Sequence, residues 1–306
     1  MRIGIMGDAV NSGTIQQVID EAQRVADDGL DTYWVPQIFG HDALTVLAIV
    51  GREVSGIELG TAVVPTYPRH PMMLAQQALT VQSAISPPGQ SRLALGIGLS
   101  HQIVVEGMWG MSFDKPVRHL REYLSVMMPL LEGKPVGFVG DDYRVHGGLS
   151  ISGIDRPSVL VAALGAQMLR VTGALADGTS TWCVGPKTLQ DHTVPTLAQA
   201  AADAGRGAPR VIAAFPVCVT DDVDGALARA EQVFAVYNTL PSYKAMMDRE
   251  GVGGPKDLAI VGTEAEVRDR LHEMASVGVT DLNAAVFSGN PDEAGRTRSV
   301  LKSLAS

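Results

Sequence analysis

The sequence predicts an α/β protein built as an eight-fold parallel (β/α)8 TIM barrel, and three observations lead to that prediction. Short apolar segments alternate with segments of helical periodicity along almost the whole chain. The alternation gives about eight strands, each paired with a helix, in 306 residues. Glycine is abundant, with 33 residues, which suits many turns between strands and helices. A doubly wound sheet is the alternative, but residues 7–13 do not match the Gly-x-Gly-x-x-Gly fingerprint expected after its first strand.

Eight segments are predicted as strands because each is a short apolar run bounded by turn residues. They are residues 2–6, 32–36, 57–64, 91–97, 158–163, 178–182, 210–219 and 281–287. The carboxyl ends of parallel barrel strands meet at one mouth, where barrel enzymes place their chemistry. The residues that directly follow each strand are therefore the first candidates for a functional site.

Nine segments are predicted as helices from their apolar spacing and their end signals. In the first helix, residues 15–27, apolar side chains recur on one face, and Gly29 follows as a C-terminal cap. The third helix begins after Pro71, which suits a first helical turn. The remaining predicted helices are residues 43–53, 72–85, 118–131, 167–176, 189–202, 223–237, 264–277 and 292–304.

Two stretches interrupt the alternation, and we expect them to be insertions after the fourth and seventh strands of a single domain spanning residues 1–306. Residues 133–154 predict a small hairpin that turns at Gly140 and Asp141. Residues 238–260 are too irregular for one helix and too long for an ordinary loop. The second insertion is interpreted as a lid, a partner surface or a plain surface excursion.

Composition and charge narrow the classes of function. The chain is 46% hydrophobic and 19% charged, which is typical of a folded globular protein. A net charge of −9 and the lack of any basic run argue against nucleic-acid binding. No apolar run reaches membrane-spanning length, and the N-terminus leads into a strand rather than a signal peptide. Cys183 and Cys218 lie in apolar strand-like surroundings, which predicts buried free thiols and a cytoplasmic protein.

Residues 93–102 form the segment that most favours a ligand site. The apolar run ends in Gly96 and Gly98, which remove side chains where something must come close. Ser100 and His101 then supply the first polar groups beyond the strand. Relief of crowding inside a barrel is the alternative interpretation of the two glycines.

Several motifs, taken in order, resemble the bacterial-luciferase-like flavin and deazaflavin oxidoreductases. The strongest are residues 59–71 (LGTAVVPTYPRHP) and residues 95–101 (LGIGLSH). The others are residues 118–124, 140–145, 161–165, 176–178, 262–267 and 278–280. The resemblance covers essentially the whole chain, and the actinobacterial branch that uses coenzyme F420, a deazaflavin, is the most similar one.

This resemblance implies an F420-dependent oxidoreductase that transfers a hydride between the deazaflavin and a small organic substrate. It implies a non-prolyl cis peptide at Ala62–Val63, set against the cofactor ring at the end of the third strand. It also implies that the cofactor's phosphate tail binds at the turn before the helix over residues 167–176, and that the protein is a homodimer.

The resemblance and the residues together predict the site. His101 and Gln37 are the predicted catalytic residues, since Gln37 stands where several relatives carry Asp-His and His101 where many carry a glutamate. A histidine there could shuttle a proton near neutral pH. The predicted cofactor-binding residues are Ala62, Val63, Gly98, Ser100, His101, Leu164, Gly165, Ala166 and Thr181.

Among the remaining polar residues, Arg69 is a candidate for binding an anionic group because it lies just past the third strand, and His70 could reach the barrel mouth. We expect His119 and His192 on the surface or in loops, and Arg118 with Glu122 on a solvated charged face. No metal site is expected, because no pair of histidines shows metal-ligand spacing with further partners.

Two alternative functions stay open. An FMN-dependent luciferase-like monooxygenase would use the same fold. An F420-binding protein without catalysis of its own is the other alternative, which the missing Asp-His makes plausible.

Overall fold

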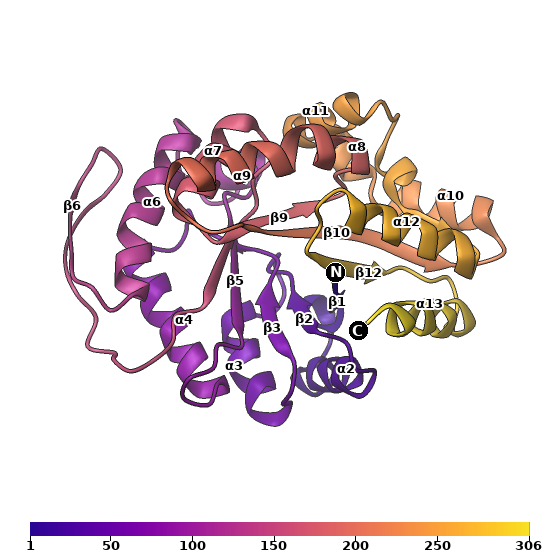
Figure 1. The fold of residues 1–306 in the computed structure, drawn as a ribbon, viewed down its shortest axis with the longest axis horizontal. Helices are drawn as coiled ribbons and strands as arrows, with labels where there is room; N and C mark the ends of the chain where they lie inside the picture. Colours follow the sequence, from indigo (N-terminus) through magenta and orange to yellow (C-terminus); the bar gives the residue numbers. More distant parts are fainter. Residues whose placement is uncertain (306) are drawn as a thin grey trace.

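The computed structural model describes residues 1–305, in which eight parallel strands close into a barrel, and Figure 1 shows their arrangement. Each strand pairs in parallel with its neighbours, and pairings of β9 with β10 and of β12 with β1 close the ring. The predicted barrel is therefore confirmed. In order around the ring, the strands are β1 (Arg2–Met6), β2 (Thr32–Val35), β3 (Glu58–Thr61), β5 (Leu93–Gly98), β8 (Ser158–Val161), β9 (Gly178–Trp182), β10 (Arg210–Val219) and β12 (Asp281–Val286).

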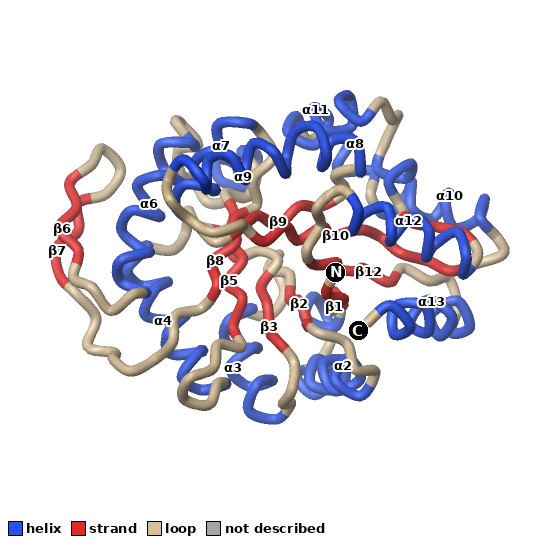
Figure 2. The backbone as a smooth tube through the Cα atoms, viewed as in Figure 1, coloured by secondary structure: helices blue, strands red, loops and turns tan. Residues whose placement is uncertain are grey.

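Helices surround the strands, as the blue segments of Figure 2 show. Side-chain capping explains several helix starts: Thr14 and Gln17 form a reciprocal capping box, as do Thr263 and Glu266. The principal helices are α2 (Ile15–Asp27), α3 (Ala43–Glu53), α4 (Pro71–Ile85), α6 (Pro116–Leu131), α7 (Ala166–Leu175), α9 (Val194–Asp203), α10 (Val223–Val233), α12 (Glu264–Ser276) and α13 (Pro291–Leu304). No helix among the described residues is both long and apolar enough to cross a membrane.

Shorter elements account for the differences from the predicted boundaries. The helix predicted over residues 189–202 is preceded by α8 (Pro186–Thr188) and begins as a π-helix, η1 (Leu189–Thr193). The helix predicted over residues 223–237 ends at Val233, and a 3-10 turn, η2 (Ala235–Thr239), follows. The other short elements are α1 (Ala9–Ser12), α5 (Gln102–Gly107), β4 (Val64–Pro65), β11 (Ile260–Gly262) and η3 (Pro255–Leu258).

The first insertion is the predicted hairpin. Strands β6 (Val136–Val139) and β7 (Arg144–Gly147) pair antiparallel, and the backbone N–H of Gly140 donates to Tyr143 O at 2.8 Å. The hairpin projects beside α6 at the left of Figure 1.

The second insertion contains a ten-residue helix, α11 (Pro241–Glu250), that the sequence did not predict. The prediction that no single helix spans residues 238–260 is confirmed, because α11 ends at Glu250 and is capped by Gly251, whose φ of 87° breaks the helix. The turn η3 then leads into β11, which pairs with β10.

Side chains fill the inside of the barrel in layers. At the amino-terminal end of the strands lie Arg2, Glu58, Arg210 and Asp281, joined by ion pairs of 2.6–3.3 Å. The middle layer contains Trp34, Ala94, Leu160 and Ile212, which form their own buried cluster. The carboxyl end, at the mouth, carries the candidate site.

Candidate active site

The cis peptide bond between Ala62 and Val63 lies directly after β3, at the predicted position. The two glycines of β5 admit this segment. A Cβ atom on Gly98 would lie 2.7 Å from Val63 Cγ2, and one on Gly96 would overlap the carbonyl oxygen of Thr61. The close approach predicted for these glycines is thus an approach of the neighbouring strand, and Val63 is the side chain that Gly98 accommodates.

Ser100 and His101 follow β5 at the mouth, as expected. Ser100 has a φ of 62°, in the left-handed region, and His101 begins helix α5 without capping it through its side chain. Burial lowers the pKa of the His101 imidazole, so the ring is neutral at pH 7 and one ring nitrogen can accept a proton.

Aromatic residues of the second insertion cover this part of the mouth. The ring of Tyr243, on α11, lies 5.9 Å from the ring of His101, and 4.9 Å from Tyr237 on η2. Tyr237 in turn packs against Trp182 at the end of β9. Burial raises the pKa of Tyr237 to about 12, so its hydroxyl stays protonated and can donate a hydrogen bond. The sequence does not single out either tyrosine, since the insertion is interpreted as a lid, a partner surface or a plain surface excursion.

The carboxylate of Glu250 fastens the insertion to the barrel. Glu250 is the last residue of α11 and accepts backbone N–H bonds from Lys187 at 3.2 Å and Thr188 at 2.7 Å. Gly185 leaves the necessary room, because a Cβ atom there would collide with the Glu250 side chain. The insertion is therefore a covering element held at a defined point.

The turn at Gly165 presents an uncapped helix start at the mouth. Gly165 is the N-cap of α7 and makes no side-chain cap, and the first turn of α7 contains no acidic residue. A Cβ atom on Gly165 would have no heavy atom within 4 Å, so the space beside the turn is open. The backbone N–H groups of such a helix start bind anionic groups such as phosphate.

His192 contacts the backbone of this turn, and its position differs from the one predicted. The sequence predicts His192 on the surface or in a loop, but His192 is buried in η1, and its Nε2 lies 2.9 Å from Leu164 O. The carbonyl accepts, so Nε2 must carry the proton. A single histidine in a sequence carries no signal of such a role, because the partner is distant in the chain.

Two predicted site residues have their side chains engaged elsewhere. The side-chain Oε1 of Gln37 accepts from the backbone N–H of Ala43 at 3.2 Å, which helps to cap α3. The hydroxyl of Thr181 donates to Ile212 O at 3.3 Å within the sheet. Side chains alternate along a strand, so the side chain of the next residue, Trp182, points to the opposite face of β9. Gln37 thus keeps only part of its polar capacity for a ligand, and Trp182 replaces Thr181 among the residues that line the mouth.

The region around α6 corrects two further predictions. His119 is buried, stacks on Tyr67 with ring centroids 4.0 Å apart, and its Nε2 lies 3.0 Å from Thr66 Oγ1. Glu122 is buried rather than solvated, because its carboxylate accepts three backbone N–H bonds of 2.8–3.0 Å from the turn of the hairpin, at Asp141, Asp142 and Tyr143.

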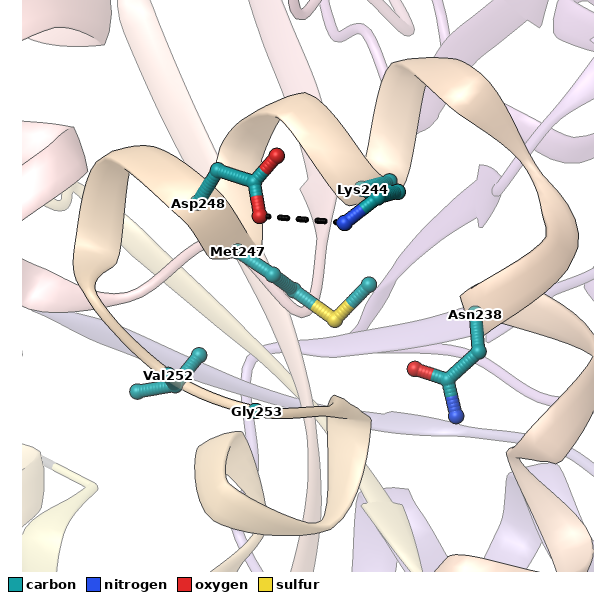
Figure 3. A pocket seen from close by; sticks show the side chains of 6 residues that line it. All are labelled: Asn238, Lys244, Met247, Asp248, Val252 and Gly253. Carbon is teal, nitrogen blue, oxygen red and sulfur yellow. Dashed lines mark hydrogen bonds and ion pairs between the residues drawn. The ribbon is translucent and has the colours of Figure 1, made fainter.

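A pocket of about 210 Å³ lies within the second insertion itself (Figure 3). Lys244, Met247 and Asp248 line it from α11, and Lys244 pairs with Asp248 at 3.3 Å. Asn238 lines it from η2 and Gly253 from the segment after α11. The pocket lies beside the covering helix and includes none of the predicted site residues.

The chain is similar to known proteins in both sequence and structure. The family model described as luciferase-like monooxygenase matches residues 1–281. An F420-dependent glucose-6-phosphate dehydrogenase of Nocardia farcinica is 29% identical over 243 residues, which cover 74% of this chain and 71% of that protein. A 5,10-methylenetetrahydromethanopterin reductase of Archaeoglobus fulgidus is 24% identical over 298 residues, which cover 87% and 86%.

Several solved structures share the fold. An F420-dependent secondary alcohol dehydrogenase, in complex with an F420-acetone adduct, has a TM-score of 0.80 at 19% identity, covering 98% of this chain and 97% of the other. The oxygenating constituent of 3,6-diketocamphane monooxygenase from Pseudomonas putida, in complex with FMN, has a TM-score of 0.76 at 14% identity, covering 100% and 98%.

Proposed function

The chain belongs to the luciferase-like monooxygenase family, and from that premise we propose that it is an F420-dependent oxidoreductase acting on a small organic substrate. The observation that carries the proposal is the uncapped start of α7 at Gly165, on the same mouth as the Ala62–Val63 segment and His101. Relatives whose names include F420 align over most of the chain, which supports this cofactor over FMN.

The residues present fit such a cofactor. The backbone N–H groups at Ala166 and its successors would hold the phosphate of the tail, with Leu164 and Gly165 forming the turn. Ala62 and Val63 would form an apolar wall for the ring, with Gly98 and Ser100 beside it. When bound, a deazaflavin supplies a carbon that gives or takes a hydride.

His101 would manage the proton that accompanies the hydride. Its neutral imidazole would accept a proton from a substrate hydroxyl during oxidation and return it to a carbonyl during reduction. The aromatic cover formed by Tyr237 and Tyr243 would exclude water from the reacting groups. Gln37 would contribute at most through the part of its amide that does not cap α3.

The first test is a fluorescence titration of the purified protein with F420 and, separately, with FMN. We expect saturable binding of F420 and much weaker binding of FMN. Tight FMN binding without F420 binding would instead favour a luciferase-like monooxygenase that activates oxygen. If F420 binds but no acceptor in a broad screen oxidises its reduced form, the protein binds the cofactor without using it.

A charge placed at the start of α7 tests where the tail lies. Gln167 is exposed in the first turn, so Gln167→Glu brings a carboxylate to the proposed phosphate position. We expect the Kd for F420 to rise about 5- to 10-fold, which corresponds to about 1 kcal/mol. Gln76→Glu makes the same change on the exposed face of α4 and serves as the matched control. Equal Kd values for both variants would show that the phosphate tail of the cofactor does not bind at the start of α7.

A further inference from the structure

We propose that Asn283, inside the barrel below the mouth, determines substrate specificity by hydrogen-bonding a neutral polar group of the substrate. The inference rests on the proposed function, since it concerns the same mouth. Asn283 lies on β12 and is fully buried, yet neither its Nδ2 nor its Oδ1 has a partner among the described residues. Leaving a buried amide unpaired costs about 1–3 kcal/mol, so such groups normally bind water or a ligand.

The side chain of Asn283 points into the barrel rather than toward the helices. Its neighbours Leu282 and Ala284 both belong to the core between the sheet and the helices, and successive residues of a strand alternate between the two faces. Asn283 pairs in register with Gly4 on one side and with Ala214 on the other. Neither neighbour supplies a polar side chain.

A second unpartnered group lies at the same level. The Nε1 of Trp34 is buried and has no acceptor within residues 1–305, and a Cβ atom on Gly4 would lie only 2.7 Å from it. Because Gly4 pairs directly with Asn283, the indole N–H and the amide border the same part of the barrel interior. Together they offer two kinds of donor and one acceptor.

The layer above Asn283 is partly exposed to solvent. Ala62 packs against the interior cluster, and Ala162 and Ala285 take the same inward face of their strands. All three are partly exposed at the mouth, whereas Asn283 and Trp34 are fully buried. These small side chains would let a substrate group reach down to the amide.

Charge decides which kind of group fits. The ion-paired layer below is balanced, with Arg2 and Arg210 against Glu58 and Asp281. The middle layer, at Trp34, Ala94, Leu160 and Ile212, carries no charge. A carboxylate or phosphate would therefore have no counter-charge beside Asn283, and a hydroxyl or a carbonyl is the group that this site accepts.

Gln82 is the matched contrast within the chain. It is also fully buried, but its Oε1 accepts from the Leu93 N–H at 3.0 Å and its Nε2 donates to Gln90 O at 3.2 Å. Both hydrogen bonds of the Gln82 amide therefore stabilise the folded protein. Replacing Gln82 with leucine should leave two backbone groups unpaired, whereas Asn283→Leu should remove an unpaired amide.

The first arm of the test compares the thermal stability of the two leucine variants without added ligand. We expect Gln82→Leu to lower Tm and Asn283→Leu to keep or raise it, by about 2–4 °C. A fall of Tm in Asn283→Leu as large as that in Gln82→Leu would show that the fold needs the amide, and would overturn the proposal.

The second arm measures Tm shifts with cyclopentanol, cyclopentanone and cyclopentanecarboxylate, with and without F420. We expect the alcohol and the ketone to shift wild type but not Asn283→Leu, Asn283→Thr to recover part of the shift, and the carboxylate to shift none of them. Responses that are the same in wild type and Asn283→Leu, including no response, would overturn the proposal. F420 titration of the same variants keeps this result separate from a failure of the proposed cofactor.

Discussion

At the scale of single residues, His101 combines a position at the mouth with an environment that keeps it neutral. We expect His101→Ala to lower kcat by about 10²- to 10⁴-fold while changing the Kd for F420 little, because the imidazole would act on the proton and not on the cofactor tail. Stopped-flow kinetics and fluorescence titration would measure the two quantities. Unchanged turnover would remove His101 from the mechanism.

The lowered pKa of His101 also predicts a pH profile for substrate oxidation. A proton acceptor works only in its neutral form, so the rate should be constant near pH 7 and fall as pH drops below the lowered pKa. The pH dependence of kcat checks this. Tyr243→Phe, which keeps the ring beside His101, is the control for a change in local packing.

His119 predicts a loss of stability in acid. Burial lowers its pKa from 6.5 to about 4, an effect that the nearby Asp142 and Glu122 only partly offset. Between these values the unfolded chain binds more protons than the folded one, so the free energy of unfolding falls as pH drops through that window. The contribution is up to about 3 kcal/mol. Urea unfolding from pH 7 to pH 4 should show this slope, and His119→Gln should flatten it.

At the scale of elements, the contact between η1 and the α7 turn couples a π-helix to the proposed phosphate site. His192→Phe removes the hydrogen bond to Leu164 O while keeping a buried ring. We expect the Kd for F420 to rise about 2- to 10-fold, which corresponds to the net value of one hydrogen bond. If His192→Phe folds and its Kd for F420 is unchanged, the contact between η1 and the α7 turn does not contribute to cofactor binding.

The attachment of α11 predicts how the insertion moves. Glu250→Ala removes the carboxylate that two backbone N–H groups share, so α11 should detach from the start of α8 more often. Faster hydrogen exchange across residues 238–254 would be the direct measure, with little change in Tm. Glu53→Ala, at the exposed end of α3, provides a control for loss of a surface carboxylate.

Elements and site were predictable from the sequence to different degrees. All eight barrel strands were expected close to their observed bounds, because short apolar runs between turn signals are a local property. Helix α11 was missed, since Pro241 and the surrounding glycines suggest irregular chain and few of its side chains are apolar. Glu122 and His119 were misjudged because their burial depends on a hairpin that approaches from elsewhere in the chain.

At the scale of the whole molecule, the two ends of the barrel differ in composition and in their expected roles. The amino-terminal end is closed by paired charges, and the carboxyl end carries small side chains, an uncapped helix start and the aromatic cover. A barrel divided in this way can tolerate change at the mouth as long as the charged layer holds the strands together. The unpaired amide of Asn283 lies between the two, where stability and function are expected to oppose each other.

The charged layer itself predicts a large loss of stability without a loss of cofactor affinity. Asp281 is buried and pairs with Arg210 at 2.6 Å and with Arg2 at 3.3 Å, so Asp281→Ala leaves two arginines to share the carboxylate of Glu58 in this layer. We expect the free energy of unfolding to fall by about 3–5 kcal/mol.

Glu132→Ala, which breaks the exposed pair with Lys134, is the control and should lower the free energy of unfolding by less than about 1 kcal/mol. Urea unfolding gives both values, and F420 titration of folded Asp281→Ala should match wild type, because the layer lies at the opposite end from the mouth. A weakened Kd there would mean that the charged layer also shapes the site.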